Sequence, residues 1–368
     1  MILKHMISVY MKLVKASAST FGIFSADFLK TLGIPFYLAF THFMLALDNI
    51  FYPDWKKVEI ENPVFIIGHP RSGTTFFHRL MLKTDEFLSF KSWHLQFPSL
   101  TARKLFKPMV MNKIANGTHV MFPPETGHHT RLDTVEEEEQ LYLHVCDTQF
   151  VSIIFSLAFY NGDFDELLYN DEQAHSEASI KHLKNCIKRH IYYTGKKQVM
   201  ARCNFSAMRI KTLAKAFPDA KFVYIYRNPL DSINSHLSLN TNVFDYKWNL
   251  DKIGEEAMNR YYDRRYRYNV EFYKYFEDVK NNSGLLDGKV IEVFYNDFLE
   301  NFEPTIKKVE AFMEIPFSDE MKEAIEEQAE KQKSYKRKHK NFDLSKFGLT
   351  EEKVREDLPF MFEKIGEA

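Results

Sequence analysis

The residues from Gly68–Thr75 have the types and spacing of a loop that holds a phosphate group. The apolar run Pro63–Ile67 leads into this loop, and a helical pattern begins at Thr74. Backbone N–H groups of such a turn, together with the amino end of the next helix, form a site for an anion. The Gly68–Gly73 spacing is that of a Walker A loop, but Thr74 stands where the lysine of that motif belongs. Arg71 is the strong cation inside the loop, so we expect a phosphate-bearing donor that is held differently than in an ordinary ATPase.

Two further stretches accompany this loop. Arg227 follows the apolar run Phe222–Tyr226 and precedes Ser235 by eight residues, and Asn341–Thr350 reads Asn-Phe-Asp-Leu-Ser-Lys-Phe-Gly-Leu-Thr. The loop Gly-His-Pro-Arg-Ser-Gly-Thr-Thr resembles the 5′-phosphosulfate loop of sulfotransferases that use 3′-phosphoadenosine 5′-phosphosulfate (PAPS). Arg227 and Ser235 look like the 3′-phosphate site of that family, and the third stretch is similar to the end of its large, mainly bacterial branch. The resemblance covers about residues 60 to 365, and the first two motifs in this order are specific.

The resemblance implies PAPS as co-substrate, a hydroxyl acceptor and no metal. Sulfuryl transfer needs both partners positioned, the leaving phosphate oxygens neutralised and a proton accepted from the attacking hydroxyl. We assign Arg71 to the bridging leaving oxygen, because its planar fork suits phosphate geometry. The residues expected to hold the donor's phosphates are Ser72, Gly73, Thr74 and Thr75 for the 5′ side and Arg227 and Ser235 for the 3′ side.

Two more basic positions are candidates for the same site. Related enzymes carry a basic residue close to the position of Arg202, which makes Arg202 a candidate for stabilising charge on the transferring group; a structural ion pair is the alternative. The run Lys331–Lys340 reads by itself as a solvated helix end or loop. The resemblance implies a basic loop that closes on the 3′-phosphate, with Arg337, Lys338 and Lys340 as its contacts.

The general base has two candidate positions. His94 follows Arg71 by 23 residues, near a position where many relatives have a glutamate, and histidine has a suitable pKa for accepting a proton near neutral pH. Glu137, Glu138 and Glu139 are the main rivals, in a run of four glutamates that resembles an acidic motif of this branch, and His128 and His129 are weaker rivals. Such a run is ordinarily a solvated helix face, but residues three or four apart share a face, so one of them could enter the cleft.

Other classes of function fit the sequence less well. A P-loop kinase using ATP lacks its lysine at Thr74 and has no use for the Arg227–Ser235 pair, and a non-catalytic nucleotide-binding protein is a third class. A net charge of −1 gives no global attraction to nucleic acid. The acceptor is expected to be a hydrophobic alcohol such as a sterol, a hydroxyquinone or a lipid, with carbohydrate or tyrosine acceptors as alternatives.

The elements that position these residues are typical of an α/β protein. Short apolar strands are predicted at Val64–Ile67, Phe222–Tyr226 and Val290–Phe294, with helical patterns between them. Such alternation favours a parallel sheet flanked by helices, here in a P-loop-like arrangement. A helix is predicted over Asn204–Phe217. The residues from Asp85–Gly195 have weaker signals and are expected to form a helical and loop insertion over the active site.

The first 52 residues form a separate apolar helical segment, and we predict the sulfotransferase domain over residues 53–368. Thr31–Leu47 carries no charge other than that of a protonated His42, and Lys4, Lys12, Lys15 and Lys30 precede it. A helical hairpin packed on the domain and a monotopic membrane anchor are the two main readings; a full span, which takes about 20 apolar residues, is the third. Three widely spaced cysteines fit a reducing cytoplasm, so the predicted location is cytoplasmic, with peripheral contact to the inner face of the membrane.

Overall fold

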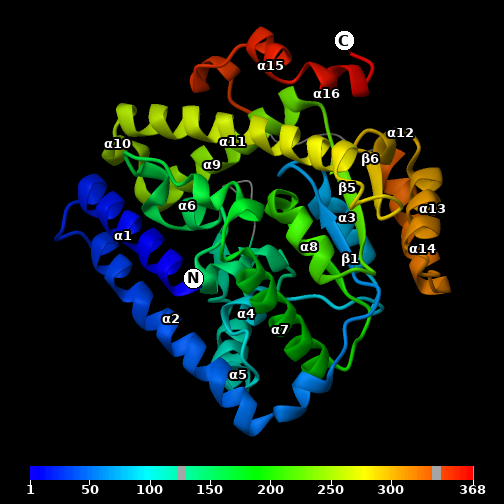
Figure 1. Ribbon diagram of the computed structural model, residues 1–368, viewed down its shortest axis with the longest axis horizontal. Coiled ribbons are helices and arrows are strands. Elements are labelled where there is room, and N and C mark those ends of the chain that lie inside the picture. The colour runs from blue at the N-terminus through cyan, green and yellow to red at the C-terminus, as the bar shows by residue number, and fades with distance from the viewer. Residues whose placement is uncertain (123–129, 334–340, 368) are drawn as a thin grey trace. The chain divides into compact units, whose positions relative to one another are not determined.

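The computed structural model describes residues 1–122, 130–333 and 341–367. The chain divides into two compact units, and Figure 1 traces it from the N-terminus to the C-terminus. We call the first the helical unit, made of Met1–Glu59, Phe90–Gly195 and Leu239–Arg265. The second is the sheet unit, made of Ile60–Ser89, Lys196–Ser238 and Tyr266–Ala368. The unit boundaries at 238/239 and 265/266 fall within the helices α9 (Pro229–Trp248) and α11 (Glu255–Asn282).

The sheet unit is built on four parallel strands in the order β4-β1-β5-β6. Their bounds are Met200–Arg202 for β4, Val64–Ile67 for β1, Lys221–Tyr226 for β5 and Val290–Phe294 for β6. In the register, Val64 pairs with both Met200 and Lys221. All four residues of β1 are fully buried, as expected for the centre of a parallel sheet covered on both faces. The three strands predicted from the sequence are confirmed.

Helices flank this sheet and complete its core. They include α3 (Thr74–Met81), α8 (Ile210–Ala216), α12 (Asp297–Glu300), α13 (Phe302–Met313) and α14 (Asp319–Lys333). Side chains from β1, α3, β6, α13 and α14 form one buried apolar cluster. The chain then continues through η8 (Leu344–Phe347), α15 (Glu351–Asp357) and α16 (Pro359–Lys364). The α/β fold with a parallel sheet flanked by helices is therefore confirmed.

The segment after β4 differs from its prediction. The continuous helix predicted over Asn204–Phe217 is instead a 3-10 helix, η7 (Asn204–Arg209), followed by α8. The strand β4 itself was not predicted, because three residues are too few to show a period. The Cys203 N–H donates to the Ile66 carbonyl at 2.9 Å, and the Ser206 N–H donates to the Cys203 carbonyl at 3.1 Å. The chain thus turns tightly as it leaves the sheet, which explains the 3-10 geometry.

The helical unit consists of long α-helices and several short helices. Its principal elements are α1 (Ile2–Phe21), α2 (Ala26–Phe51), η1 (Pro53–Lys57), α4 (Ser92–Gln96), α5 (Leu100–Ala115), η3 (Glu138–Val145), α6 (Val151–Ile154), η4 (Ser156–Phe159) and α7 (Ser176–Thr194). Two short antiparallel strands, β2 (Val120–Phe122) and β3 (Thr130–Arg131), also belong to it.

The N-terminal helices α1 and α2 pack side by side as a hairpin (Figure 1). Ser25 begins α2, where its hydroxyl accepts the Phe28 N–H at 3.1 Å, as expected of an N-cap. Val9 and Leu13 of α1 and Leu38 and Leu45 of α2 are buried within the helical unit. The hairpin is therefore packed into the unit along its inner face.

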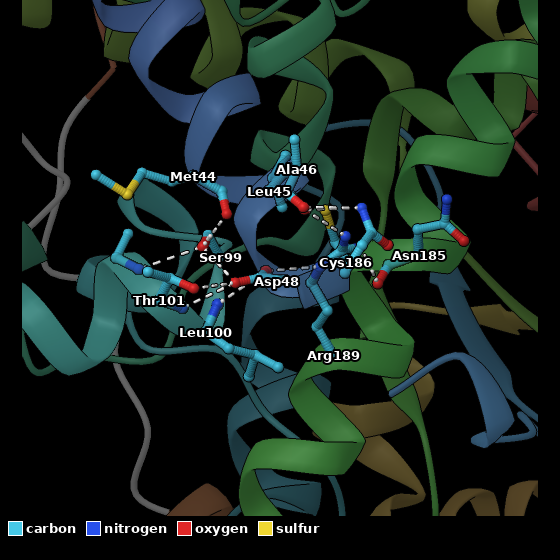
Figure 2. Close-up of polar contacts among 12 residues, drawn as sticks. Met44, Leu45, Ala46, Asp48, Ser99, Leu100, Thr101, Asn185, Cys186 and Arg189 are labelled. Atoms are coloured by element: carbon cyan, nitrogen blue, oxygen red, sulfur yellow. Dashed lines mark hydrogen bonds and ion pairs between the residues drawn. The ribbon is translucent and has the colours of Figure 1, made fainter. Parts of the chain in front are cut away.

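A buried carboxylate fixes the carboxyl end of α2, as Figure 2 shows. Asp48 is fully buried, and its Oδ2 accepts the Arg189 Nε–H of α7 at 2.9 Å. Its Oδ1 accepts the Ser99 hydroxyl at 2.8 Å and the Thr101 N–H at 2.9 Å, both at the amino end of α5. Arg189 also lies over the Trp55 ring, with its guanidinium carbon 3.7 Å from the ring centre. These contacts tie α2 to α5 and α7, so the N-terminal helices are structural members of the helical unit.

Candidate active site

The loop between β1 and α3 has a backbone that few residues can adopt. Gly68 has φ +142°, and a Cβ there would lie 2.2 Å from the Ile225 carbonyl oxygen of β5. Gly73 has φ +97°, and a Cβ there would lie 2.4 Å from the Tyr295 ring. Arg71 takes a left-handed conformation with φ +73° although it is not glycine. Such strain in a non-glycine residue is characteristic of functional sites, and here it presents an arginine from the middle of the loop.

Ser72 shapes this loop through its hydroxyl. Its Oγ lies 2.6 Å from the His69 carbonyl oxygen and 2.8 Å from the Ile225 carbonyl oxygen, and the side chain is fully buried. The Ser72 N–H also donates to the His69 carbonyl, at 3.2 Å. Ser72 was predicted to contact the 5′-phosphate. The contact with the Ile225 carbonyl connects the loop to β5, so Ser72 holds the loop in shape, and its predicted contact with the 5′-phosphate stays a prediction.

The amino end of α3 offers donors to an anion. Among the described residues no side chain caps this helix, whose N-cap is Gly73, and the Phe77 N–H makes the first helical bond, to the Gly73 carbonyl at 3.1 Å. The N–H groups of Thr74 and Thr75 precede that bond, where a helix has no acceptors of its own. The positive end of the helix dipole also favours a negative charge here. The geometry of Gly73, Thr74 and Thr75 thus suits the phosphate contact predicted for them.

A hydrogen bond joins the first two sequence motifs. The Arg71 Nε–H donates to the Ser235 Oγ of α9 at 3.1 Å, across 164 residues of sequence. Arg227 follows β5, and its Nη2 donates to the Asp231 carboxylate at 2.7 Å. Its guanidinium also lies over the Tyr295 ring, 4.7 Å from the ring centre. The structure therefore brings Arg71, Ser235 and Arg227 to one end of the sheet, beside the loop.

Arg202 reaches the same end of the sheet from β4. It pairs with Ile66 of β1 in the sheet register, two residues before Gly68, and it is 1% exposed. Its positive charge is close enough to His78 of α3 to lower the pKa of that histidine, which burial already lowers well below its ordinary value. A buried arginine next to the loop suits the predicted role of stabilising negative charge.

Aromatic and polar side chains beneath the loop were missed by sequence reasoning. His69 is fully buried and stacks on the Tyr273 ring, with ring centres 4.9 Å apart. The Tyr273 hydroxyl shares a hydrogen bond with the Ser232 hydroxyl at 2.7 Å, and the His236 ring lies edge-on to His69 at 5.5 Å. This layer connects the loop to α9 and α11. His69 lies inside the loop motif and could have been found there, whereas Tyr273 has no local signal.

The predicted C-terminal contacts Arg337, Lys338 and Lys340 lie outside the described residues. The chain just after them packs on α9: the Phe342 N–H donates to the Ser238 Oγ at 3.0 Å. A cavity of about 760 Å³ is lined there by Asn234, by the segment Asn341–Ser345 and by the following turn. Since Asn234 precedes Ser235, the described part of the third sequence motif lies near the predicted 3′-phosphate site.

The candidate bases His94 and Glu137 to Glu139 belong to the helical unit, and His128 and His129 lie outside the described residues. His94 of α4 is 8% exposed, and its Nδ1 accepts the Lys91 N–H at 3.2 Å. Because Nδ1 is an acceptor, the neutral ring carries its proton on Nε2. Burial lowers the pKa of His94 strongly, and the nearby Arg103 guanidinium lowers it further. Both features oppose the protonation that a general base undergoes.

The four glutamates are buried, which contradicts the reading of a solvated helix face. Glu136, Glu138 and Glu139 are at most 1% exposed, and Glu137 is 9% exposed. Glu138 begins the 3-10 helix η3, and its Oε1 accepts the Phe90 N–H at 3.4 Å. Four carboxylates are rarely buried together unless the fold supplies partners for them, and the composition of this run did not reveal that burial.

Three side chains of the types that bind metal ions also lie close together in the helical unit. Ligand atoms of His5, Asp147 and His175, all buried, lie within 4.8 Å of one another. The two rings are stacked, with centres 3.7 Å apart, and the His5 Nε2 lies 3.0 Å from the Cys146 carbonyl oxygen. In stacked rings the nitrogen lone pairs lie in parallel planes, so they do not converge on one position where a metal ion could bind. We therefore interpret the group as an anchor for α1, together with the Asn170 amide that donates to Asp147 at 2.9 Å.

Comparison with known proteins agrees with the sequence motifs. A family model described as "Sulfotransferase family" matches residues 63–319. Two curated relatives, from Mycobacterium bovis and Mycobacterium tuberculosis, are each named omega-hydroxy-beta-dihydromenaquinone-9 sulfotransferase Stf3. Each is 26% identical over 178 residues, which cover 47% of this chain and 44% of the relative. The alignment thus spans less than half the length of these relatives.

Solved structures share the fold at low sequence identity. The crystal structure of sulfotransferase STF1 from Mycobacterium tuberculosis has a TM-score of 0.68 at 17% identity, covering 96% of this chain and 91% of that chain. Sulfotransferase STF9 from Mycobacterium avium has a TM-score of 0.67 at 14% identity, covering 87% of this chain and 81% of that chain. At these identities the likeness concerns the fold.

Proposed function

The chain belongs to the sulfotransferase family, and we propose that it transfers a sulfuryl group from PAPS to the hydroxyl of a hydrophobic alcohol. The observation that carries this proposal is the hydrogen bond between Arg71 and Ser235. Arg71, from the loop predicted to bind the 5′ side, is thus next to a hydroxyl of the predicted 3′ site, which supports the proposal. A donor with phosphates at both ends of one nucleoside would engage both motifs together.

In the proposed reaction the acceptor oxygen attacks sulfur as the bond from sulfur to the bridging phosphate oxygen breaks. The electron pair of that bond stays on the phosphate, so negative charge grows on the leaving group. Arg71, Arg202 and the N–H groups at the start of α3 supply fixed positive charge and donors for it. The acceptor's proton passes to a general base. No step in this scheme uses a metal.

Nucleotide binding tests the donor assignment. Arg227→Ala removes a charged donor aimed at the 3′-phosphate, a contact of about 1.5–3 kcal/mol, so affinity for adenosine 3′,5′-bisphosphate should fall more than tenfold. Affinity for AMP, which has no 3′-phosphate, should change much less. Calorimetry on the full chain with the bisphosphate, AMP and ATP–Mg²⁺ measures all three. Preference for ATP–Mg²⁺ would support the kinase alternative, and equal losses for bisphosphate and AMP would show that Arg227 is misassigned.

For the general base we favour the buried acidic run, with Glu137 and Glu138 as the candidates, over His94. The low pKa of His94 and the bond from Lys91 to its Nδ1 support this preference. Glu137→Gln or Glu138→Gln should then lower turnover about 10²- to 10⁴-fold, with bisphosphate affinity near that of the wild type. His94→Gln should cost less than about tenfold. The opposite ranking would return the base to His94.

A hydrophobic acceptor is supported by the outer face of α2. Leu29, Leu32, Phe36, Phe43 and Ile50 recur at helical spacing, and they are between 39% and 78% exposed. By length and composition, α2 is also apolar enough to cross a membrane, and 28% of its apolar window is buried. A helix with one face packed on protein and an apolar outer face suits the plane of a membrane interface. The relatives whose name specifies a hydroxylated menaquinone derivative point to the same chemical class.

Vesicle flotation tests this peripheral contact. The full chain should float with anionic vesicles, and Phe36→Asp combined with Phe43→Asp should leave it in the soluble fraction. Leu299→Asp, at an exposed leucine of the sheet unit, is the matched control and should not change flotation. Flotation that survives the double change would argue against membrane contact through α2. Carbohydrate or tyrosine acceptors would then become the favoured alternatives.

A further inference from the structure

A cavity lies within the helical unit between the N-terminal hairpin and the elements that it covers. Its volume is about 280 Å³, near the lower end of small-molecule sites. Most of its wall is aliphatic: Leu13 of α1, Leu38 of α2, Leu95 of α4, Leu143 of η3 and Val151 of α6 all contribute. A space of this size and lining suits a segment of hydrocarbon chain rather than a nucleotide or a sugar.

Two residues of the cavity wall carry buried polar atoms without hydrogen bonds in the described part of the chain. Ser92 Oγ and His144 Nδ1 belong to residues that line the cavity and are 4% and 2% exposed. Neither atom has a hydrogen-bond partner in the described part of the chain. Buried polar atoms in that state destabilise a protein until a partner reaches them. Two such atoms in one cavity therefore indicate a ligand with polar groups as well as an apolar chain.

The two atoms have complementary hydrogen-bonding roles. His144 Nε2 lies 2.8 Å from the Leu95 carbonyl oxygen, which can only accept, so Nε2 carries the proton. Burial lowers the pKa of His144 to about 4, so the ring is neutral near pH 7 and its Nδ1 is an acceptor. The Ser92 hydroxyl can both donate and accept. An alcohol has both functions, because its O–H can donate to His144 and its oxygen can accept from Ser92.

One residue of the cavity wall is also part of the exposed surface of α2. Tyr37 lines the cavity and is also 42% exposed, and its hydroxyl donates to the Gln96 carbonyl of α4 at 2.9 Å. The adjacent residue Phe36 is 78% exposed. Tyr37 therefore connects the cavity wall to the apolar face from which a chain could leave a bilayer.

We propose that this cavity binds the hydrocarbon chain of a membrane-derived alcohol, with Ser92 and His144 as hydrogen-bonding partners for its polar groups. The proposal rests on the function proposed above in one respect: if that function holds, the bound alcohol is the sulfate acceptor. Binding in the cavity does not itself require the donor, so the two can be tested separately.

The test uses the full chain and a hexadecanol that carries a photoreactive diazirine, presented in phosphatidylcholine vesicles. After illumination, mass spectrometry should find the label on peptides from α2, α4 and η3, and unlabelled hexadecanol should displace it. Leu38→Trp fills the cavity and should lower labelling at least tenfold. Leu32→Trp, on the same helix but 39% exposed, is the matched control and should label as the wild type does.

Ser92→Ala keeps the proposal testable if Leu38→Trp fails to fold. It removes a hydroxyl that has no hydrogen-bond partner among the described residues, so the melting temperature should stay the same or rise, while affinity for the alcohol should fall about 2- to 10-fold. Unchanged affinity in Ser92→Ala, or equal labelling of the Leu38→Trp and Leu32→Trp variants, would overturn the proposal. So would the absence of displaceable labelling in folded wild-type protein, which would leave water as the occupant.

Calorimetry with adenosine 3′,5′-bisphosphate on the same samples separates the two proposals. Unchanged bisphosphate binding in a variant that no longer labels shows a defect confined to the cavity. Labelling in a protein that does not bind the bisphosphate would instead support the cavity and refute the proposed donor.

Discussion

Asp48 should be among the most costly single residues to change in the helical unit, because it is buried and holds three elements together. Its two oxygens accept five hydrogen bonds, of which the one from Arg189 is an ion pair between buried groups. Removing one partner of a buried pair costs about 3–5 kcal/mol, since the other charge stays buried. We expect Asp48→Ala to lower the free energy of unfolding by about that amount.

The isosteric change Asp48→Asn probes the geometry more finely. The asparagine oxygen can replace Oδ1 and keep the bonds from Ser99 and Thr101. Its NH₂ group then faces two donors, the Leu100 N–H and the Arg189 Nε–H, which Oδ2 accepts in the native protein at 3.1 and 2.9 Å. Asparagine should therefore destabilise the unit as well, although it conserves the shape of the side chain.

Urea unfolding followed by circular dichroism measures these changes. Asp27→Ala is the control on the same helix, because its pair with Lys30, at 3.3 Å, is exposed and should contribute less than about 1 kcal/mol. Adding Arg189→Met to Asp48→Ala should recover part of the loss, since the methionine can still pack on Trp55 and leaves no buried charge. Losses no larger than the control, or strictly additive effects of Asp48→Ala and Arg189→Met, would refute the reasoning.

The remaining predictions concern the loop and pH. Gly68→Ala should abolish bisphosphate binding, because its Cβ would meet the Ile225 oxygen at 2.2 Å. Gly33→Ala should leave binding unchanged, because beyond the adjacent helix backbone no described atom lies within 4 Å of its Cβ; calorimetry can verify both outcomes. Arg71→Ala should lower turnover about 10²- to 10³-fold in a folded protein; wild-type turnover in a labelled-PAPS assay would exclude its role at the leaving group. The buried His144, whose pKa falls from 6.5 to about 4 on folding, takes up its proton first in the unfolded state. The free energy of unfolding should therefore fall as pH drops from 6.5 toward 4, by about 2 kcal/mol at pH 5. Urea titrations of His144→Gln should show a loss over the same pH range that is smaller than the wild-type loss by about this amount.

The sequence by itself determined the elements that carry the donor loop. Buried parallel strands are short apolar runs, and the helices between them have their own period, so β1, β5 and β6 could be recognised locally. The loop from Gly68 to Gly73 could also be predicted from the sequence, because its backbone conformation requires glycines. Gly68 has no room for a Cβ against β5. The sequence shows this constraint directly, because glycine is the residue type that meets it.

Tertiary structure decided which polar residues meet and which are buried. The bond from Arg71 to Ser235 spans 164 residues, and no local pattern specifies such a contact. The run beginning at Glu136 looks solvated because four charges favour water, yet its burial is set by segments that are distant in sequence. The pKa of His94 likewise depends on the fold, because burial and the nearby Arg103 lower it below the ordinary value of a histidine. The cavity lined by Ser92 and His144 exists only once α1 and α2 have packed over it, because its wall is formed by several elements together.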